Sequence, residues 1–211
     1  LNYIIAHGGR SDLEPVPVPT PVVRFAAFGD SITSVWMPTP DALTYTGYSW
    51  IPHLDDSKFE HVGGYAHGGY TTAQVAANAT AVECDLAVVM LGTNDVGPPP
   101  WGTEWSIVRQ GLIDIVAKSN APRALICAVP PRNNDAPLGT AEAQRTLEHN
   151  ERVRLLALDM GWGWVDPWFT VRAPSGQWAH QTLTDDGIHP TPVAAARCAR
   201  EIPSAMQEEA S

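Results

Sequence analysis

Residues 25–33 read FAAFGDSIT, and this stretch decides the fold class. Its first four residues are apolar, which is typical of a buried strand, and Gly29 ends that strand. Ser31, with Asp30 directly before it, therefore lies where the strand ends, and open α/β sheets hold their chemistry at this edge. A serine hydroxyl is a weak nucleophile until a base removes its proton. The stretch thus indicates catalysis only if the chain also supplies a histidine and an acid that orients it.

Beyond this stretch, short β-rich runs alternate with longer helical patterns. Such alternation is typical of a parallel sheet with helices on both faces, so we predict a single three-layer α/β/α sandwich with five strands. Thr71 with Gln74 predicts a capping box, and Thr191 before Pro192 predicts a capped helix start. We expect strands at 22–29, 59–64, 85–91, 123–129 and 163–166, and helices at 47–54, 72–83, 103–119, 141–160 and 192–208.

Composition excludes several classes of protein. With 211 residues, 44% hydrophobic and 17% charged, the chain can bury one sizeable core. Its longest apolar run is too short to span a bilayer. A net charge of −10 with 13 Lys and Arg leaves no basic surface for nucleic acid, and favours a neutral or cationic substrate. The three cysteines are not spaced with histidines as metal ligands, so we expect neither a metal nor a cofactor.

The first 21 residues differ from the rest of the chain. Residues 15–21 read PVPVPTP, which is typical of a polyproline linker. We therefore predict an N-terminal extension at 1–21 and the folded domain at 22–211. The linker, and a sequence that begins with Leu1, favour a processed protein or a domain cut from a longer one. The proline-rich leader and the eight tryptophans favour a secreted or extracellular protein, and the sequence leaves the oligomeric state open.

Three further blocks follow strands of the same predicted sheet. Residues 68–72 read GGYTT after the second strand, 92–95 read GTND after the third, and 186–190 read DGIHP after the fifth. Each block alone is a plausible turn, but their joint order after successive strands favours a catalytic site. The last block supplies the histidine and the acid that Ser31 requires.

This ordering resembles the SGNH hydrolases, a branch of the GDSL esterases and lipases, over residues 22 to about 200. The resemblance implies a flavodoxin-like sheet. It also implies that Ser31 is the nucleophile, His189 the general base and Asp186 the acid that holds the imidazole. Gly69, Asn94 and the Ser31 backbone N–H would then form the oxyanion hole. Gly69 is preferred to its neighbouring glycine because the family glycine is usually followed by one residue and then threonine.

The roles also make physical sense. Donors at Asn94, Gly69 and Ser31 would stabilise the negative charge that acyl transfer builds on the carbonyl oxygen. A loop turn can bring the Asp186 carboxylate to one ring nitrogen of His189, leaving the other for Ser31. The Gly-x-Ser-x-Gly elbow of the larger α/β-hydrolases does not fit, because Thr33 stands at its second glycine.

Four aromatic residues near these blocks are candidates for substrate binding. His67 and Tyr70 flank the second block, Trp36 follows the nucleophile and Trp178 precedes the last block. A position in solvent explains His67 equally simply, and packing against the core or an edge explains the two tryptophans.

We expect a serine esterase that cleaves short acyl esters, O-acetyl groups above all, on small molecules or carbohydrates. Two alternatives remain open from the sequence. One is a lysophospholipase or thioesterase of the same family, and the other is a non-catalytic binding or structural module of a larger assembly with the same fold.

Overall fold

A five-stranded sheet forms the centre of the protein in a computed structural model that describes residues 22–33, 47–97, 102–132 and 138–210. Every neighbouring pair of strands is parallel, and the strand order is β2-β1-β3-β4-β5. The strands are β1 (Val23–Gly29), β2 (Phe59–Ala66), β3 (Leu86–Met90), β4 (Ala124–Cys127) and β5 (Gly163–Val165). This is the flavodoxin-like order, so the predicted fold class is confirmed.

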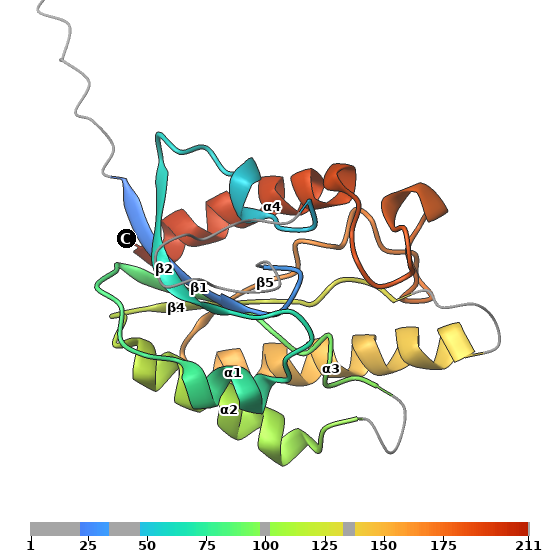
Figure 1. Cartoon of the computed structure of the whole chain (residues 1–211), viewed down its shortest axis with the longest axis horizontal. Helices are drawn as coiled ribbons and strands as arrows, with labels where there is room; N and C mark the ends of the chain where they lie inside the picture. The colour runs from blue at the N-terminus through green and yellow to red at the C-terminus, as the bar shows by residue number, and fades with distance from the viewer. Residues whose placement is uncertain (1–21, 34–46, 98–101, 133–137, 211) are drawn as a thin grey trace, which may run out of the picture.

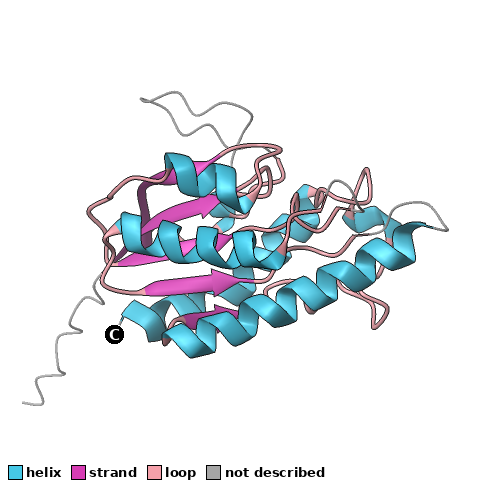
Figure 2. Ribbon diagram, turned by 90° about the horizontal axis from the view of Figure 1, so that it is seen from below, coloured by secondary structure: helices cyan, strands magenta, loops and turns pink. Residues whose placement is uncertain are grey.

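Helices cover both faces of the sheet (Figure 1). On one face lie α1 (Thr72–Asn78), α2 (Trp105–Ser119) and α3 (Leu138–Met160), and Figure 2 shows this face from below. On the other face lie α4 (Pro192–Ala210) and the short 3₁₀ turn η1 (Ile51–His53). Each layer encloses its own hydrophobic core, and all five residues of β3 are buried between the two. A strand that is buried on both faces must be apolar throughout, as this one is.

The predicted strands agree with those observed, apart from their ends. The capping box is confirmed, because the Gln74 side chain accepts the backbone N–H of Thr71 at 2.9 Å and α1 begins at the next residue. Helix α4 likewise begins at Pro192, directly after Thr191.

Two predicted helices are wrong in length. The chain forms only η1 within 47–54, since the Ser49 hydroxyl donates to the Thr33 carbonyl at 2.6 Å and holds the preceding residues against the end of β1. Helix α1 ends at Asn78 instead of residue 83, because the Val82 N–H bonds to Ser119 O at 3.1 Å. In both cases a contact with a distant segment replaces the local helical bond.

Strands β1 and β3 are neighbours, and the connections that leave them cross to opposite faces of the sheet. In a doubly wound sheet this is the point where the loops diverge and leave a crevice. Ser31 follows β1, and the turn 92–95 follows β3. The fold therefore brings two of the four predicted blocks to the position where such sheets hold their sites.

In the described part of the chain, no helix is both long and apolar enough to cross a membrane. The predicted N-terminal extension at 1–21 lies outside the described residues. Among the described residues, the first element is β1, which begins at Val23.

Candidate active site

A tight turn at the end of β1 presents Ser31. The Thr33 N–H bonds to Asp30 O at 3.1 Å, and the Asp30 carboxylate accepts the Ile32 N–H at 3.0 Å. A side chain at Gly29 would place its Cβ 2.2 Å from Thr33 Oγ1, so only glycine allows the turn to close this tightly. The Ser31 residue is 8% exposed, which leaves its hydroxyl at the floor of the site.

Ser31, His189 and Asp186 form one continuous chain of hydrogen bonds. The Ser31 Oγ and His189 Nε2 atoms are 2.9 Å apart, and His189 Nδ1 lies 2.6 Å from Asp186 Oδ2. When Nδ1 carries the ring proton and donates a hydrogen bond to the carboxylate, Nε2 can accept the proton of the serine hydroxyl. The structure thus brings together the nucleophile, base and acid that the sequence predicts.

The loop that carries the acid and the base is held in shape by its own hydrogen bonds. Asp186 Oδ1 accepts the backbone N–H groups of Ile188 and His189 at 2.9 and 2.7 Å. The Thr184 hydroxyl accepts the Gly187 N–H and donates to the His189 carbonyl. The imidazole is therefore already oriented before any substrate binds.

The carboxyl group of Asp186 is tuned to stay ionised. Burial raises its pKa, but hydrogen bonds from the His189 ring and from the backbone N–H groups of His189 and Ile188 outweigh burial, so the pKa lies below its ordinary value. An ionised carboxylate at this position favours the imidazolium that forms when His189 takes a proton.

Asp30 is a second, deeply buried carboxyl group beside the nucleophile. Burial raises its pKa to about 6, although the Ile32 N–H and the nearby Thr93 side chain favour the ionised form. Asp30 also interacts electrostatically with His189. Near neutral pH it therefore adds negative charge close to the imidazole.

The predicted oxyanion donors come from the ends of three neighbouring strands. The Asn94 amide donates one hydrogen bond to the Tyr70 carbonyl at 2.9 Å, which fixes its orientation and leaves its second N–H for a ligand. Gly69 has a φ of +78°, and no atom lies within 4 Å of the position that a Cβ would take. These positions, with the Ser31 N–H, follow β3, β2 and β1, and their role as oxyanion donors stays a prediction.

Asp95 fixes the turn that carries Asn94, a role that the sequence did not reveal. This buried carboxylate accepts the backbone N–H and the hydroxyl of Thr72 at 2.9 and 2.8 Å, so it ties the turn after β3 to the start of α1. Arg132, from the loop after β4, adds a bond from its guanidinium to the Thr93 carbonyl at 2.9 Å. The signal available was position alone, since both residues lie in the loops that follow apolar strands.

A glycine behind this turn leads to a prediction about stability. Gly92 has a φ of +128°, and a Cβ on it would lie 1.9 Å from Nε2 of the buried His149. We expect Gly92→Ala to lower the free energy of unfolding by about 3 kcal/mol, from backbone strain and steric overlap together, in urea denaturation. Gly161→Ala is the control, since φ there is +69° with nothing within 4 Å. Equal losses for the two variants would contradict the packing of His149 on Gly92.

The four candidates for substrate binding have different outcomes. The His67 and Tyr70 rings stack with centroids 3.8 Å apart beside Gly69, and both residues are partly buried. Trp178 is only 4% exposed, and its indole N–H donates to the Gly187 carbonyl at 3.1 Å. It therefore supports the loop of the acid and base from below, which corrects its expected place at a substrate-binding rim. Trp36 lies outside the described residues.

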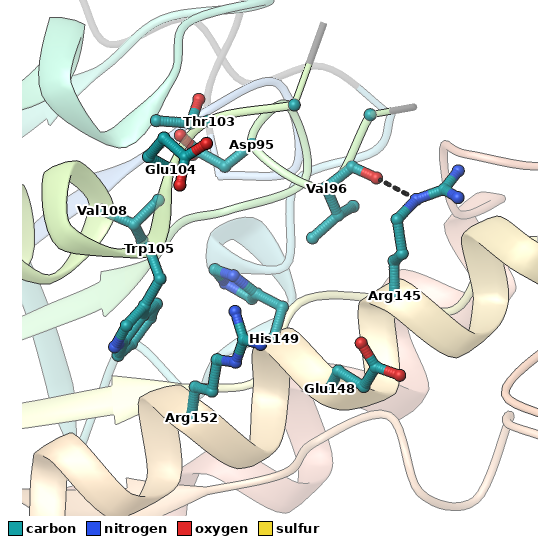
Figure 3. A pocket seen from close by; sticks show the side chains of 12 residues that line it. Asp95, Val96, Thr103, Glu104, Trp105, Val108, Arg145, Glu148, His149 and Arg152 are labelled. Carbon is teal, nitrogen blue, oxygen red and sulfur yellow. Dashed lines mark hydrogen bonds between the residues drawn. The ribbon is translucent and has the colours of Figure 1, made fainter. Parts of the chain in front are cut away.

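A separate pocket of about 370 Å³ opens between the start of α2 and α3 (Figure 3). Arg145, His149 and Arg152 from α3 line one side, and the Arg145 guanidinium bonds to the Val96 carbonyl at 3.1 Å. None of the predicted catalytic residues lines this pocket. It borders the site only from behind, through Asp95.

The sequence matches the family model of the GDSL-like lipases and acylhydrolases over residues 27–197. No curated protein matches the sequence. Solved structures that are similar to the chain include a GDSL-like lipase from Bacteroides thetaiotaomicron, with 18% identity, a TM-score of 0.64 and coverage of 88% of both chains. An acetylxylan esterase from Geobacillus stearothermophilus, solved as a catalytic mutant, has 15% identity and a TM-score of 0.61, with 90% of this chain and 96% of that chain covered. At these identities the likeness shows the fold.

Proposed function

Since the chain belongs to the GDSL-like lipase and acylhydrolase family, we propose that it is a serine esterase that hydrolyses short acyl esters through an acyl-serine intermediate. One observation carries this proposal: the hydrogen bonds that run from Ser31 through His189 to Asp186. In this arrangement a neutral imidazole can take the serine proton while the carboxylate stabilises the resulting positive charge. The family match and the fold support a hydrolase independently of this geometry.

In the first half of the reaction, Ser31 Oγ attacks the ester carbonyl carbon while His189 Nε2 takes the hydroxyl proton. The carbonyl electron pair moves to the oxygen, which becomes an oxyanion. When that pair returns, the bond to the alcohol oxygen breaks, and His189 donates its proton to the departing alcohol. The acyl group is then an ester of Ser31.

In the second half, a water molecule attacks the acyl-serine carbonyl and His189 takes one of its protons. Collapse of the second oxyanion breaks the bond to Ser31 Oγ, and His189 returns the proton to this oxygen. The products are a carboxylic acid and the free enzyme. The same base and the same oxyanion donors thus serve both halves.

We further propose short acyl groups, acetyl above all, on neutral alcohols such as carbohydrate hydroxyls. The stacked rings of His67 and Tyr70 support this choice, since aromatic faces pack well against sugar rings. The net charge of −10 disfavours anionic substrates. One of the similar solved structures is named as an acetylxylan esterase, which is consistent with this substrate class. It supports the proposal only through the similarity of its fold.

A fluorophosphonate probe with intact-mass detection tests the proposed reaction. We expect the wild-type chain to gain one probe, Ser31→Ala to gain none, and Ser106→Ala, at an exposed position on α2, to react like the wild type. Labelling of another residue would assign the nucleophile elsewhere. A wild-type chain that does not react would favour the non-catalytic module.

The rate should depend on pH through the general base. We expect kcat/KM to fall as the pH is lowered from about 8 to about 5, because a protonated imidazole cannot accept the serine proton. Asp30, with a pKa of about 6, becomes neutral in the same range, which removes negative charge close to His189. Circular dichroism at each pH separates this loss from unfolding. A rate that stays flat across the range would exclude His189 as the base.

Acyl length distinguishes an esterase from a lipase. Outside its predicted strands and helices, the sequence has no long apolar insertion of the kind that forms a lipase lid over a long acyl chain. On p-nitrophenyl esters we expect kcat/KM to peak at about two to four acyl carbons and to drop beyond about eight. Ser31→Ala gives the background rate for each ester. A maximum at long chains, increased by detergent interfaces, would favour the lysophospholipase or lipase alternative.

A further inference from the structure

Tyr48 lies flat against the imidazole of His189. The two ring centroids are 4.7 Å apart and the ring planes are inclined by 25°, which is a stacked arrangement. Tyr48 belongs to the segment just before η1, whereas His189 belongs to the loop before α4. The contact therefore joins two segments that are distant in sequence, directly at the proposed base.

The position of Tyr48 is fixed from the nucleophile's side of the site. The hydroxyl of the next residue, Ser49, donates to the Thr33 carbonyl at 2.6 Å. Trp50 is fully buried, and its indole N–H donates to Thr33 Oγ1 at 3.4 Å. Thr33 closes the turn that presents Ser31. The Tyr48 backbone is thus attached to the same turn as the nucleophile.

The hydrogen bonds of the triad leave one motion of the imidazole weakly restrained. Asp186 and Ser31 bond to the two ring nitrogens of His189. The N–H group and the lone pair of an imidazole lie in the plane of the ring, so hydrogen bonds to them act mainly within that plane. These bonds set the direction in which the ring points. They resist rotation of the ring about the line that joins Asp186 and Ser31 only weakly. A second aromatic ring stacked on its face opposes this rotation.

The same ring acts on charge. The face of an aromatic ring is negative, and a cation within about 6 Å of its centre is attracted to it. When His189 takes the proton of Ser31, the positive charge forms at this distance from Tyr48. The attraction is therefore stronger in the transition state than in the resting enzyme, which is the condition for an effect on the rate.

We propose that Tyr48 is a positioning residue for the esterase reaction: its ring holds the plane of the His189 imidazole and stabilises the imidazolium formed during acyl transfer. The inference rests on the proposed function and adds to it a residue outside the four sequence blocks.

Other charged groups also act on His189 and must be held constant. Asp186 bonds to its ring from the same loop, and Asp30 acts on it from the end of β1. Arg132, from the loop after β4, acts on Asp186. None of them changes in Tyr48 variants, so a difference between those variants reports the ring alone.

The test compares Tyr48→Leu with Tyr48→Phe, which keeps the ring. Both the rate of Ser31 labelling by the fluorophosphonate and kcat/KM are measured from about pH 5 to about pH 9. For Tyr48→Leu we expect a plateau about two- to fivefold lower and an acid-side midpoint about half a pH unit lower, because the imidazolium loses its stabilisation. Tyr48→Phe should match the wild type in both. Phe169→Leu, which removes an exposed ring elsewhere, should change neither.

Each of the following results would overturn the role of Tyr48. A lower plateau with an unmoved midpoint would indicate a purely structural role, and a change in KM alone would indicate contact with substrate. An equal loss in Tyr48→Phe would assign the effect to the hydroxyl. If Ser31 of the wild-type chain is not labelled at all, the proposed function itself fails. If the wild type is labelled and Tyr48→Leu has the same rates and the same midpoint, only the role of Tyr48 is removed.

Discussion

Ser31→Ala and His189→Ala should each lower kcat by on the order of 10⁶-fold, and the double variant should be no slower than either single variant. The reason is that the two side chains act as one unit through the 2.9 Å bond between Oγ and Nε2. Without the imidazole the hydroxyl keeps its proton, and without the hydroxyl the imidazole has no nucleophile to activate. Hydrolysis of p-nitrophenyl acetate, followed in all three variants, measures the effect.

Two exposed residues of the same types serve as controls for this experiment. Ser106→Ala on α2 and His53→Ala in η1 should leave kcat unchanged, since neither contacts the site. Thermal denaturation of all variants confirms that the fold is retained. Losses that multiply in the double variant would show that Ser31 and His189 act independently, which the triad does not allow.

Replacing Asn94 by alanine should lower kcat by about 100- to 1,000-fold, equivalent to about 2.7 to 4 kcal/mol in the barrier, with little change in KM. The amide is held by its bond to the Tyr70 carbonyl, so its remaining N–H is oriented before the oxyanion forms. A donor of this kind stabilises the charge of the transition state far more than the neutral ester.

The control for Asn94 is Asn78→Ala at the exposed end of α1, where activity should not change. Asn94→Asp is a second variant of nearly the same shape, and it should be at least as slow as Asn94→Ala because a carboxylate repels the oxyanion. A normal kcat with a raised KM in Asn94→Ala would move this residue from the oxyanion hole to substrate binding.

Local features of the sequence were sufficient to predict the sheet and to identify candidate catalytic groups that the structure brings together. Strands such as β3 are apolar throughout because both faces are buried, and that pattern is visible without a structure. Asp186 and His189 lie in one loop, so their pairing depends on a short turn. The parallel sheet then brings Ser31 and Asn94 to one edge, as the order of the blocks implies.

Contacts between distant segments could not be predicted in this way. Nothing around Tyr48 in the sequence indicates that it meets His189, and Trp178 gave no sign that its indole would bond to Gly187. The same holds for Asp95 and Thr72, which lie on different elements. In each case the partner is chosen by the packing of the whole chain, which periodicity and spacing do not encode.

The proposed acid and base share one short loop, whereas the proposed nucleophile and oxyanion donors follow strands of the sheet. This loop meets other segments mainly through side chains: the indole of Trp178 on Gly187, the Ser31 hydroxyl on His189, and the ring of Tyr48 on His189. Segments attached in this way open with a smaller free energy than the global unfolding of a packed sheet. On heating, we therefore expect catalysis to cease at a temperature at which the circular dichroism of the sheet is still native. The thermal limit of the enzyme is then a property of a loop, and stabilising the hydrophobic core alone would not extend it.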